Sequence, residues 1–128
     1  MTFFFGHHHS HKIVRALREL GVDAIHLRDV FEERGVDDVV WIARAAEERW
    51  VVVTADLHIR TRKAEKTVFQ KAGLITFFVN QEYNSKQGFK KFRWIVDQWE
   101  KIEAAAATAQ PGDCFRVPLS GKILKIEE

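Results

Sequence analysis

The chain has 128 residues, 46% of them hydrophobic and 30% charged, which is enough for one compact domain with its own core. Its net charge of +2 permits a polyanionic partner but is too small to require one. The single cysteine, Cys114, excludes an internal disulfide and suits a reducing compartment, and no stretch resembles a secretion signal or a membrane span. We therefore expect a single cytoplasmic domain over residues 1–128, without a membrane partner.

Short apolar runs alternate with helical patterns along most of the chain. The run at 3–5 is three phenylalanines ended by Gly6, as expected of a strand buried on both faces. Ser10 is a suitable N-cap for the helix that follows, and Gly21 is a natural end for it. The predicted strands are residues 3–5, 24–27, 50–54 and 74–79, and the predicted helices are residues 11–20, 38–46, 63–72 and 85–107.

The longest predicted helix carries an apolar stripe at three- and four-residue spacing, which is typical of a core-facing surface. Residues 113–127 beyond it are predicted to form a small β-hairpin, so the main body of the domain is about residues 2–107. The stripe consists of Phe89, Phe92, Ile95, Val96, Trp99 and Ile102.

This alternation predicts an α/β fold, in which a mainly parallel sheet lies between two layers of helices. Such sheets bind ligands outside the carboxyl ends of their strands. The residues predicted at these ends are Gly6, Arg28 with Asp29, Thr54 with Asp56, and Asn80. The topology therefore predicts a polar site at this edge.

Acidic residues from separate segments would meet at that edge. Asp56 follows the strongest predicted strand, Asp37 and Asp38 begin a helix, and Asp29 ends another strand. Clustered carboxylates suit a hard cation such as Mg²⁺ or Mn²⁺, which prefers oxygen ligands. Thr54 could orient Asp56 by a hydrogen bond from its hydroxyl group.

Each of these acids also has a structural interpretation. Asp37 and Asp38 could simply cap a helix, and Asp29 could pair with a neighbouring arginine. Asp56 could be a turn residue.

The histidines at 7–9 lack the helical spacing of a catalytic zinc site, so we interpret them as an exposed approach to a helix, with one imidazole facing the site. His58 is a candidate for substrate contact because it is close to Asp56 in the sequence.

Basic residues follow the acid of the central strand. Arg60 and Arg62 could grip the phosphates of a nucleic acid while a metal ion neutralises the scissile phosphate. A second basic group lies early in the long predicted helix, where a solvated helix face is an equal alternative. It consists of Lys86, Lys90, Lys91 and Arg93.

Taken in order, these segments resemble a PIN-like domain of the type that includes the VapC toxin ribonucleases. The resemblance covers roughly residues 2–100. It rests on the segments 3–6, 12–21 and 26–29, on Asp38 with residues 41–42, on residues 50–56, and on residues 59–60.

The resemblance implies a three-layer α/β/α sandwich and Mg²⁺- or Mn²⁺-dependent cleavage of RNA, in many members by the toxin of a toxin–antitoxin pair. By position, Asp38 and Asp56 would be the catalytic acids that bind metal, with Asp29 as a weaker addition. An antitoxin protein is the expected partner, and a homodimer is possible.

One position departs from this family pattern. The first acid of the family directly follows the opening strand, where this chain has Gly6, which supplies no side-chain ligand. We therefore expect a nuclease that is inactive or weakened, whether the glycine is natural or introduced.

A non-catalytic PIN-like module that binds RNA or a protein is the alternative. A receiver-like phosphoacceptor domain is a weaker one, because the acid pair after the first strand and the lysine after the fourth strand are missing.

Overall fold

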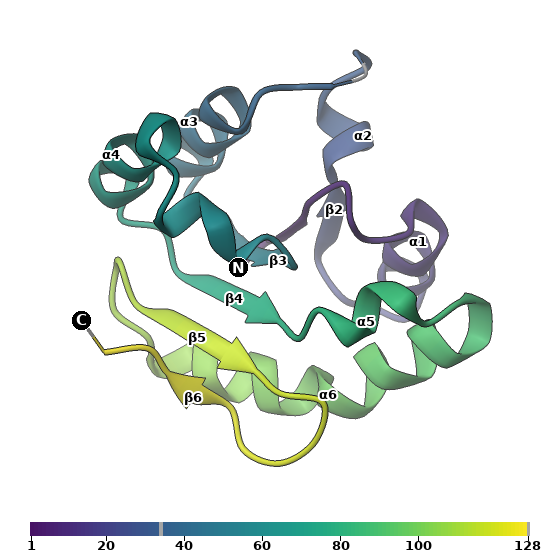
Figure 1. The fold of residues 1–128 in the computed structure, drawn as a ribbon. Helices are drawn as coiled ribbons and strands as arrows, with labels where there is room; N and C mark the ends of the chain where they lie inside the picture. Colours follow the sequence, from purple (N-terminus) through teal and green to yellow (C-terminus); the bar gives the residue numbers. More distant parts are fainter. Residues whose placement is uncertain (34, 128) are drawn as a thin grey trace.

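The structure is a computed structural model that describes residues 1–33 and 35–127. Within these residues, six strands form one sheet in the order β2-β1-β3-β4-β5-β6 (Figure 1). Only the pairing of β5 with β6 is antiparallel. The strands are β1 (Phe3–Phe5), β2 (Ala24–His26), β3 (Val51–Thr54), β4 (Thr76–Val79), β5 (Cys114–Val117) and β6 (Leu124–Lys125).

Helices lie on both faces of this sheet, which gives the expected α/β/α sandwich. The four main helices are α1 (His11–Glu19), α3 (Asp38–Glu48), α4 (Lys63–Ala72) and α6 (Gly88–Thr108). Shorter turns of helix, which the sequence did not predict as separate elements, are α2 (Leu27–Val30), η1 (Leu57–Arg60) and α5 (Glu82–Ser85). The long helix therefore begins at Gly88, three residues after the predicted start, because α5 takes up the preceding residues.

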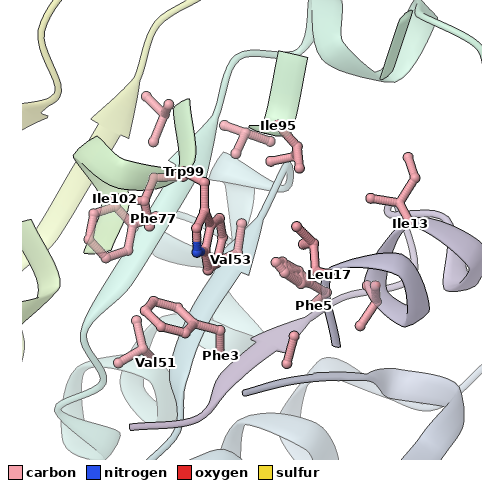
Figure 2. Packing of buried hydrophobic residues seen from close by; sticks show 14 of the residues in the cluster. Phe3, Phe5, Ile13, Leu17, Val51, Val53, Phe77, Ile95, Trp99 and Ile102 are labelled. Atoms are coloured by element: carbon pink, nitrogen blue, oxygen red, sulfur yellow. The ribbon is translucent and has the colours of Figure 1, made fainter. Parts of the chain in front are cut away.

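Alternation along the strands builds one core on each side of the sheet. Phe3 and Phe5 of β1 join a cluster with α1 and α6, while Phe4 between them joins a cluster with α3 and α4. Figure 2 shows the first cluster, where the Trp99 ring of α6 lies over the sheet beside Phe3. The centroids of these two rings are 4.8 Å apart, in an edge-to-face arrangement. Both faces of β1 are therefore buried, as the phenylalanine run predicts.

The order in which the chain adds strands to the sheet reverses between β1 and β3. The chain leaves β1 through α1 on one face to reach β2, and returns over α3 on the other face to reach β3. At such a switch point the carboxyl ends of two adjacent strands leave a crevice that suits a ligand. Phe5 pairs with Val53 in this register, so Gly6 and Thr54 are the first residues beyond the paired ends.

The apolar stripe of α6 is only partly core. Trp99, Ile95 and Ile102 are buried, but Phe89 is 75% exposed and Val96 is 43% exposed, so the expectation that these two belong to the core is wrong. The first turn of α6 extends past the edge of the sheet core, which leaves Phe89 in solvent beside basic residues. The expected C-terminal hairpin is present, and its strand β5 also pairs in parallel with β4, so the hairpin extends the main sheet.

Within the described residues, none of the helices combines the length and the apolar character needed to cross a membrane.

Candidate functional site

Two acids from distant parts of the chain meet at the switch point. Asp38 lies in the first turn of α3, and Asp56 follows β3 as the N-cap of η1. Arg62 bridges them: its Nη1 donates to Asp38 Oδ2 at 3.0 Å, and its Nη2 donates to Asp56 Oδ2 at 2.6 Å. Because both oxygens contact one planar guanidinium, they lie within about 8 Å of each other.

A third carboxylate joins this group from α4. Glu65 Oε1 lies 3.3 Å from Arg62 Nη1, and Glu65 Oε2 is buried without a hydrogen-bond partner among the described residues. We call Asp38, Asp56 and Glu65 the acid cluster. Their side chains are 12–15% exposed, whereas the Arg62 side chain is 43% exposed. The hydrogen bond to Asp56 is the main cause of the raised pKa of Arg62, whose guanidinium is charged in any case.

The protein fixes one oxygen of each aspartate. Trp41 Nε1 donates to Asp38 Oδ1 at 2.7 Å, and the His58 amide donates to Asp56 Oδ1 at 3.0 Å. The Asp56 amide in turn donates to Thr54 Oγ1 at 3.1 Å. The second oxygen, Oδ2, of each aspartate is therefore the one directed at Arg62.

Gly6 lies beside this arrangement. It is buried, its amide donates to the Val53 carbonyl at 3.4 Å, and a Cβ built on it would meet Thr54 Oγ1 at 3.8 Å. That separation is an ordinary van der Waals contact, so the backbone leaves room for a side chain directed towards the threonine that holds Asp56.

The three histidines after Gly6 have three different environments. His7 is exposed, and His8 is half-buried. Burial and the charge of His7 lower the pKa of His8, against the opposing charges of Asp56 and Asp38, so His8 lies close enough to the two aspartates to interact with their charge. His9 is buried, so the expectation that this segment is simply an exposed approach to a helix is wrong for His9.

His9 anchors the segment to the core. Its Nδ1 lies 3.0 Å from the Tyr83 hydroxyl, and its carbonyl lies 2.8 Å from His26 Nε2. Burial, with the charge of Lys91 as the next cause, lowers the pKa of His9 to about 3, so its imidazole is neutral. Lys91 Nζ donates to the His8 carbonyl at 3.1 Å. The start of α6 is therefore attached to the same segment that carries Gly6 and His8.

Asp29 belongs to a different arrangement. Its oxygens accept hydrogen bonds from His11 Nε2 at 2.7 Å, from Arg18 Nη2 at 2.6 Å and from the His26 amide at 2.8 Å. Partial burial would raise the pKa of Asp29, but these hydrogen bonds outweigh it and lower the pKa to about 2. Asp29 therefore pairs with an arginine, but with Arg18 of α1 and not with its sequence neighbour Arg28, and it also takes part in a capping box at the start of α2.

The remaining predicted residues lie around the acid cluster or apart from it. Asp37 is the N-cap residue of α3, makes no side-chain cap hydrogen bond, and lines a separate cavity of about 530 Å³ with Phe31 and Val40. Arg60 lines a cavity of about 270 Å³ with Phe69 and Cys114. His58 contacts the cluster through its backbone amide. Asn80 Oδ1 accepts from the Glu82 amide at 2.8 Å, which is a turn role.

The acid cluster suits a divalent metal in its chemistry, because carboxylate oxygens are the ligands that Mg²⁺ and Mn²⁺ prefer. In its present arrangement a guanidinium lies where the carboxylates converge. Across residues 1–33 and 35–127, no three His, Cys, Asp or Glu side chains form a group that could hold a metal ion. Gly6 lies next to Thr54, and its backbone leaves room for a Cβ there.

The sequence did not indicate Glu65 as a site residue, and it indicated Arg62 only as a phosphate contact and not as a partner of the acids. Glu65 was hidden because it lies inside a helix rather than at a strand end. Its spacing of three residues from Arg62 was the available signal, since residues three apart are neighbours on a helix surface.

A comparison with protein families agrees with this topology. The family model described as a PIN-like domain matches residues 1–81, which is more than half of the chain and includes Gly6, the acid cluster and Arg62. The chain belongs to the PIN-like domain family, and its fold is of the nuclease type. No curated protein and no solved structure matches the chain significantly.

Proposed function

We propose that this protein is a divalent-metal-dependent ribonuclease of the PIN-like family, weakened as it stands by Gly6, and the toxin of a toxin–antitoxin pair. One observation carries the nuclease proposal. Asp38 and Asp56 reach the switch point from separate elements, and both direct Oδ2 at the same cation beside Gly6. Carboxylates assembled in this way are what a metal-assisted phosphodiester hydrolase needs.

Asp38 and Asp56 would hold Mg²⁺ or Mn²⁺, with Glu65 close by, while Asp29 and Asp37 are less suited because of their own surroundings. When bound, the metal neutralises charge on the phosphate and lowers the pKa of a bound water. Thr54, Trp41 and the His58 amide keep the two aspartates in place. Arg60 and Arg62 would contact the RNA phosphates, and His58 would lie beside the substrate.

The nuclease would be weakened because position 6 supplies no side-chain ligand for the metal. Gly6 has space for a Cβ and lies next to the hydroxyl that orients Asp56. An aspartate at this position would direct a carboxylate to the same edge without a backbone change.

The test is the purified Gly6→Asp variant, assayed for cleavage of varied single-stranded RNAs with Mn²⁺ or Mg²⁺. Loss of even an outer partner of a metal ligand typically costs about 10–100-fold, so we expect Gly6→Asp to raise cleavage at least about tenfold. Gly6→Ala is the matched control, because it adds the Cβ without the carboxylate and should leave cleavage unchanged.

Adding Asp56→Asn to the Gly6→Asp variant should abolish the cleavage. A Gly6→Asp protein that is folded but silent on every RNA tested would contradict the catalytic proposal. For the toxin role, expression of the Gly6→Asp variant should arrest growth, and a protein from the neighbouring reading frame should bind the chain and relieve the arrest.

A non-catalytic RNA-binding module is the second candidate, and the surface of α6 favours it. Phe89 is 75% exposed beside Lys90 and Arg93, which are exposed too. Aromatic rings among basic residues bind single-stranded RNA by stacking and charge. This candidate predicts RNA binding that weakens with salt and persists in EDTA, together with a silent Gly6→Asp variant.

A further inference from the structure

We propose that Arg62 is the internal cation of the acid cluster, and that a divalent metal can bind Asp38 and Asp56 only by displacing the Arg62 guanidinium. This inference rests on the proposed function because it concerns the same site. It adds that the metal-free protein is closed by its own side chain, so metal affinity depends on Arg62 as well as on the acids.

The contacts place the guanidinium where a metal would have to be. Its two terminal nitrogens donate hydrogen bonds to Asp38 Oδ2 at 3.0 Å and to Asp56 Oδ2 at 2.6 Å. The other oxygen of each carboxylate accepts from the Trp41 indole or from the His58 amide. The Oδ2 atoms are therefore the ligand atoms that a metal would use, and Arg62 already contacts both.

The charges show why a second cation would be accepted in exchange. Three carboxylates surround one guanidinium, and Glu65 Oε2 has no hydrogen-bond partner among the described residues. One positive charge leaves this group with excess negative charge. A divalent ion would neutralise two carboxylates, which a guanidinium cannot do alone.

The exposures show which partner can leave. The acid side chains are 12–15% exposed and are held by fixed donors, whereas the Arg62 side chain is 43% exposed. Arg62 also lies between η1 and α4, outside both elements, as the N-cap residue of α4 without a side-chain cap hydrogen bond. A rotation of its side chain would uncover both Oδ2 atoms and leave the aspartates in place.

Metal affinity measured without RNA tests this inference. Free Mn²⁺ is followed by electron paramagnetic resonance in titrations of the natural chain, Arg62→Gln and the control Arg44→Gln. The control removes the same charge from an exposed position on α3, where Arg44 pairs with Glu48. We expect Arg62→Gln to bind Mn²⁺ at least about tenfold more tightly than the natural chain, and Arg44→Gln to differ by less than about twofold, because surface charges act weakly at a distance.

A further substitution shows where the ion binds. Adding Asp38→Asn to Arg62→Gln should remove the tighter binding. If Arg62→Gln binds Mn²⁺ no more tightly than the natural chain, or binds none, the inference is wrong. Tighter binding that survives Asp38→Asn would also overturn it.

A second measurement keeps the test valid if Arg62→Gln fails to fold. In the ¹⁵N-labelled natural chain, saturating Mg²⁺ should shift the Arg62 Nε–H resonance and leave that of Arg44 unchanged. An unmoved Arg62 resonance while Mg²⁺ shifts the Asp38 and Asp56 amides would overturn the inference.

The two proposals can fail separately. Cleavage by Gly6→Asp without any effect of Arg62→Gln on Mn²⁺ affinity would remove the inference and leave the nuclease. If Gly6→Asp cleaves no RNA but Arg62→Gln binds Mn²⁺ more tightly, the nuclease proposal is wrong and the inference about Arg62 stands.

Discussion

Two groups of acids and arginines lie near the same edge of the sheet. They have opposite ratios of hydrogen-bond donors to carboxylates. At the end of β2, the single carboxylate of Asp29 receives hydrogen bonds from three donors. In the acid cluster, the single guanidinium of Arg62 serves three carboxylates. Both groups contain an arginine–aspartate distance of 2.6 Å, so contact length does not distinguish them.

The proportion of donors to acceptors distinguishes them. Asp29 has its negative charge satisfied several times over, which is why its pKa falls to about 2. The acid cluster has negative charge left over and one buried oxygen without a partner among the described residues. An arrangement of the first kind stabilises the fold, whereas the second kind is the one on which the proposed metal site rests.

The largest expected difference is in the response to neutralising one acid. Asp29→Asn should lower the free energy of unfolding by about 2 kcal/mol, because asparagine has only one uncharged acceptor oxygen for the three donors that Asp29 binds. Asp56→Asn should cost less than about 1 kcal/mol, because the amide oxygen can keep the cap and relief of repulsion among the acids offsets the weaker bond to Arg62. Urea unfolding at pH 7 measures both. Equal losses would mean that the acid cluster serves the fold as much as Asp29 does.

A smaller effect is expected from pH. The pKa of Asp29 is lower in the folded chain than its ordinary 3.8, so its ionised form stabilises the fold. This stability is complete above about pH 4 and is lost as the pH falls through the folded value of about 2. With a discount for the exposed part of the side chain, it amounts to about 1 kcal/mol.

Unfolding of the natural chain and of Asp29→Asn between pH 5 and pH 2 isolates this contribution from the other carboxylates. The difference between the two proteins should shrink by about half over that range. A difference that stays constant down to pH 2 would show that the charge of Asp29 is unimportant.

The smallest effects concern the two arginines, which are 42% and 43% exposed and therefore make a fair comparison. Arg18→Gln and Arg62→Gln should each lower the free energy of unfolding by about 0.5–1 kcal/mol in EDTA, as is usual for exposed ion pairs. Mn²⁺ should restore the loss in Arg62→Gln and leave Arg18→Gln unchanged. Thermal unfolding with and without Mn²⁺ decides this, and an equal response of both variants would remove the distinction between the two groups.

The fold was accessible from the sequence because its signals are local. Side chains of the phenylalanine run of β1 and of the valine run of β3 are buried in the core clusters on both faces of the sheet. These segments are therefore apolar without interruption, which identified them as strands. Strand–helix alternation then determined the parallel sheet and the edge that carries Asp56 and Gly6. The prediction from helical spacing that Phe89 faces the core was wrong, because spacing along a helix cannot show where the opposing sheet ends.

The site was only partly accessible, because its decisive contacts join distant residues. Asp38 and Asp56 could be placed at one edge by topology, but their shared contact with Arg62 depends on how α3 and η1 pack. The donors that occupy Asp29 come from α1 and from the His26 backbone, so no local pattern separates Asp29 from the other acids. The burial of His9 follows from its contact with Tyr83, 74 residues away.

The space beside Gly6 has a genetic consequence. Every glycine codon becomes a codon for aspartate or glutamate when its second base changes from G to A, so one nucleotide separates this chain from one with an acid at position 6. A Cβ there would meet the Thr54 hydroxyl at an ordinary van der Waals distance of 3.8 Å, so the backbone can accept a side chain at this position. If the proposed function is right, a single mutational event would supply the carboxylate that the site lacks, and a selection for nuclease activity would recover such mutants.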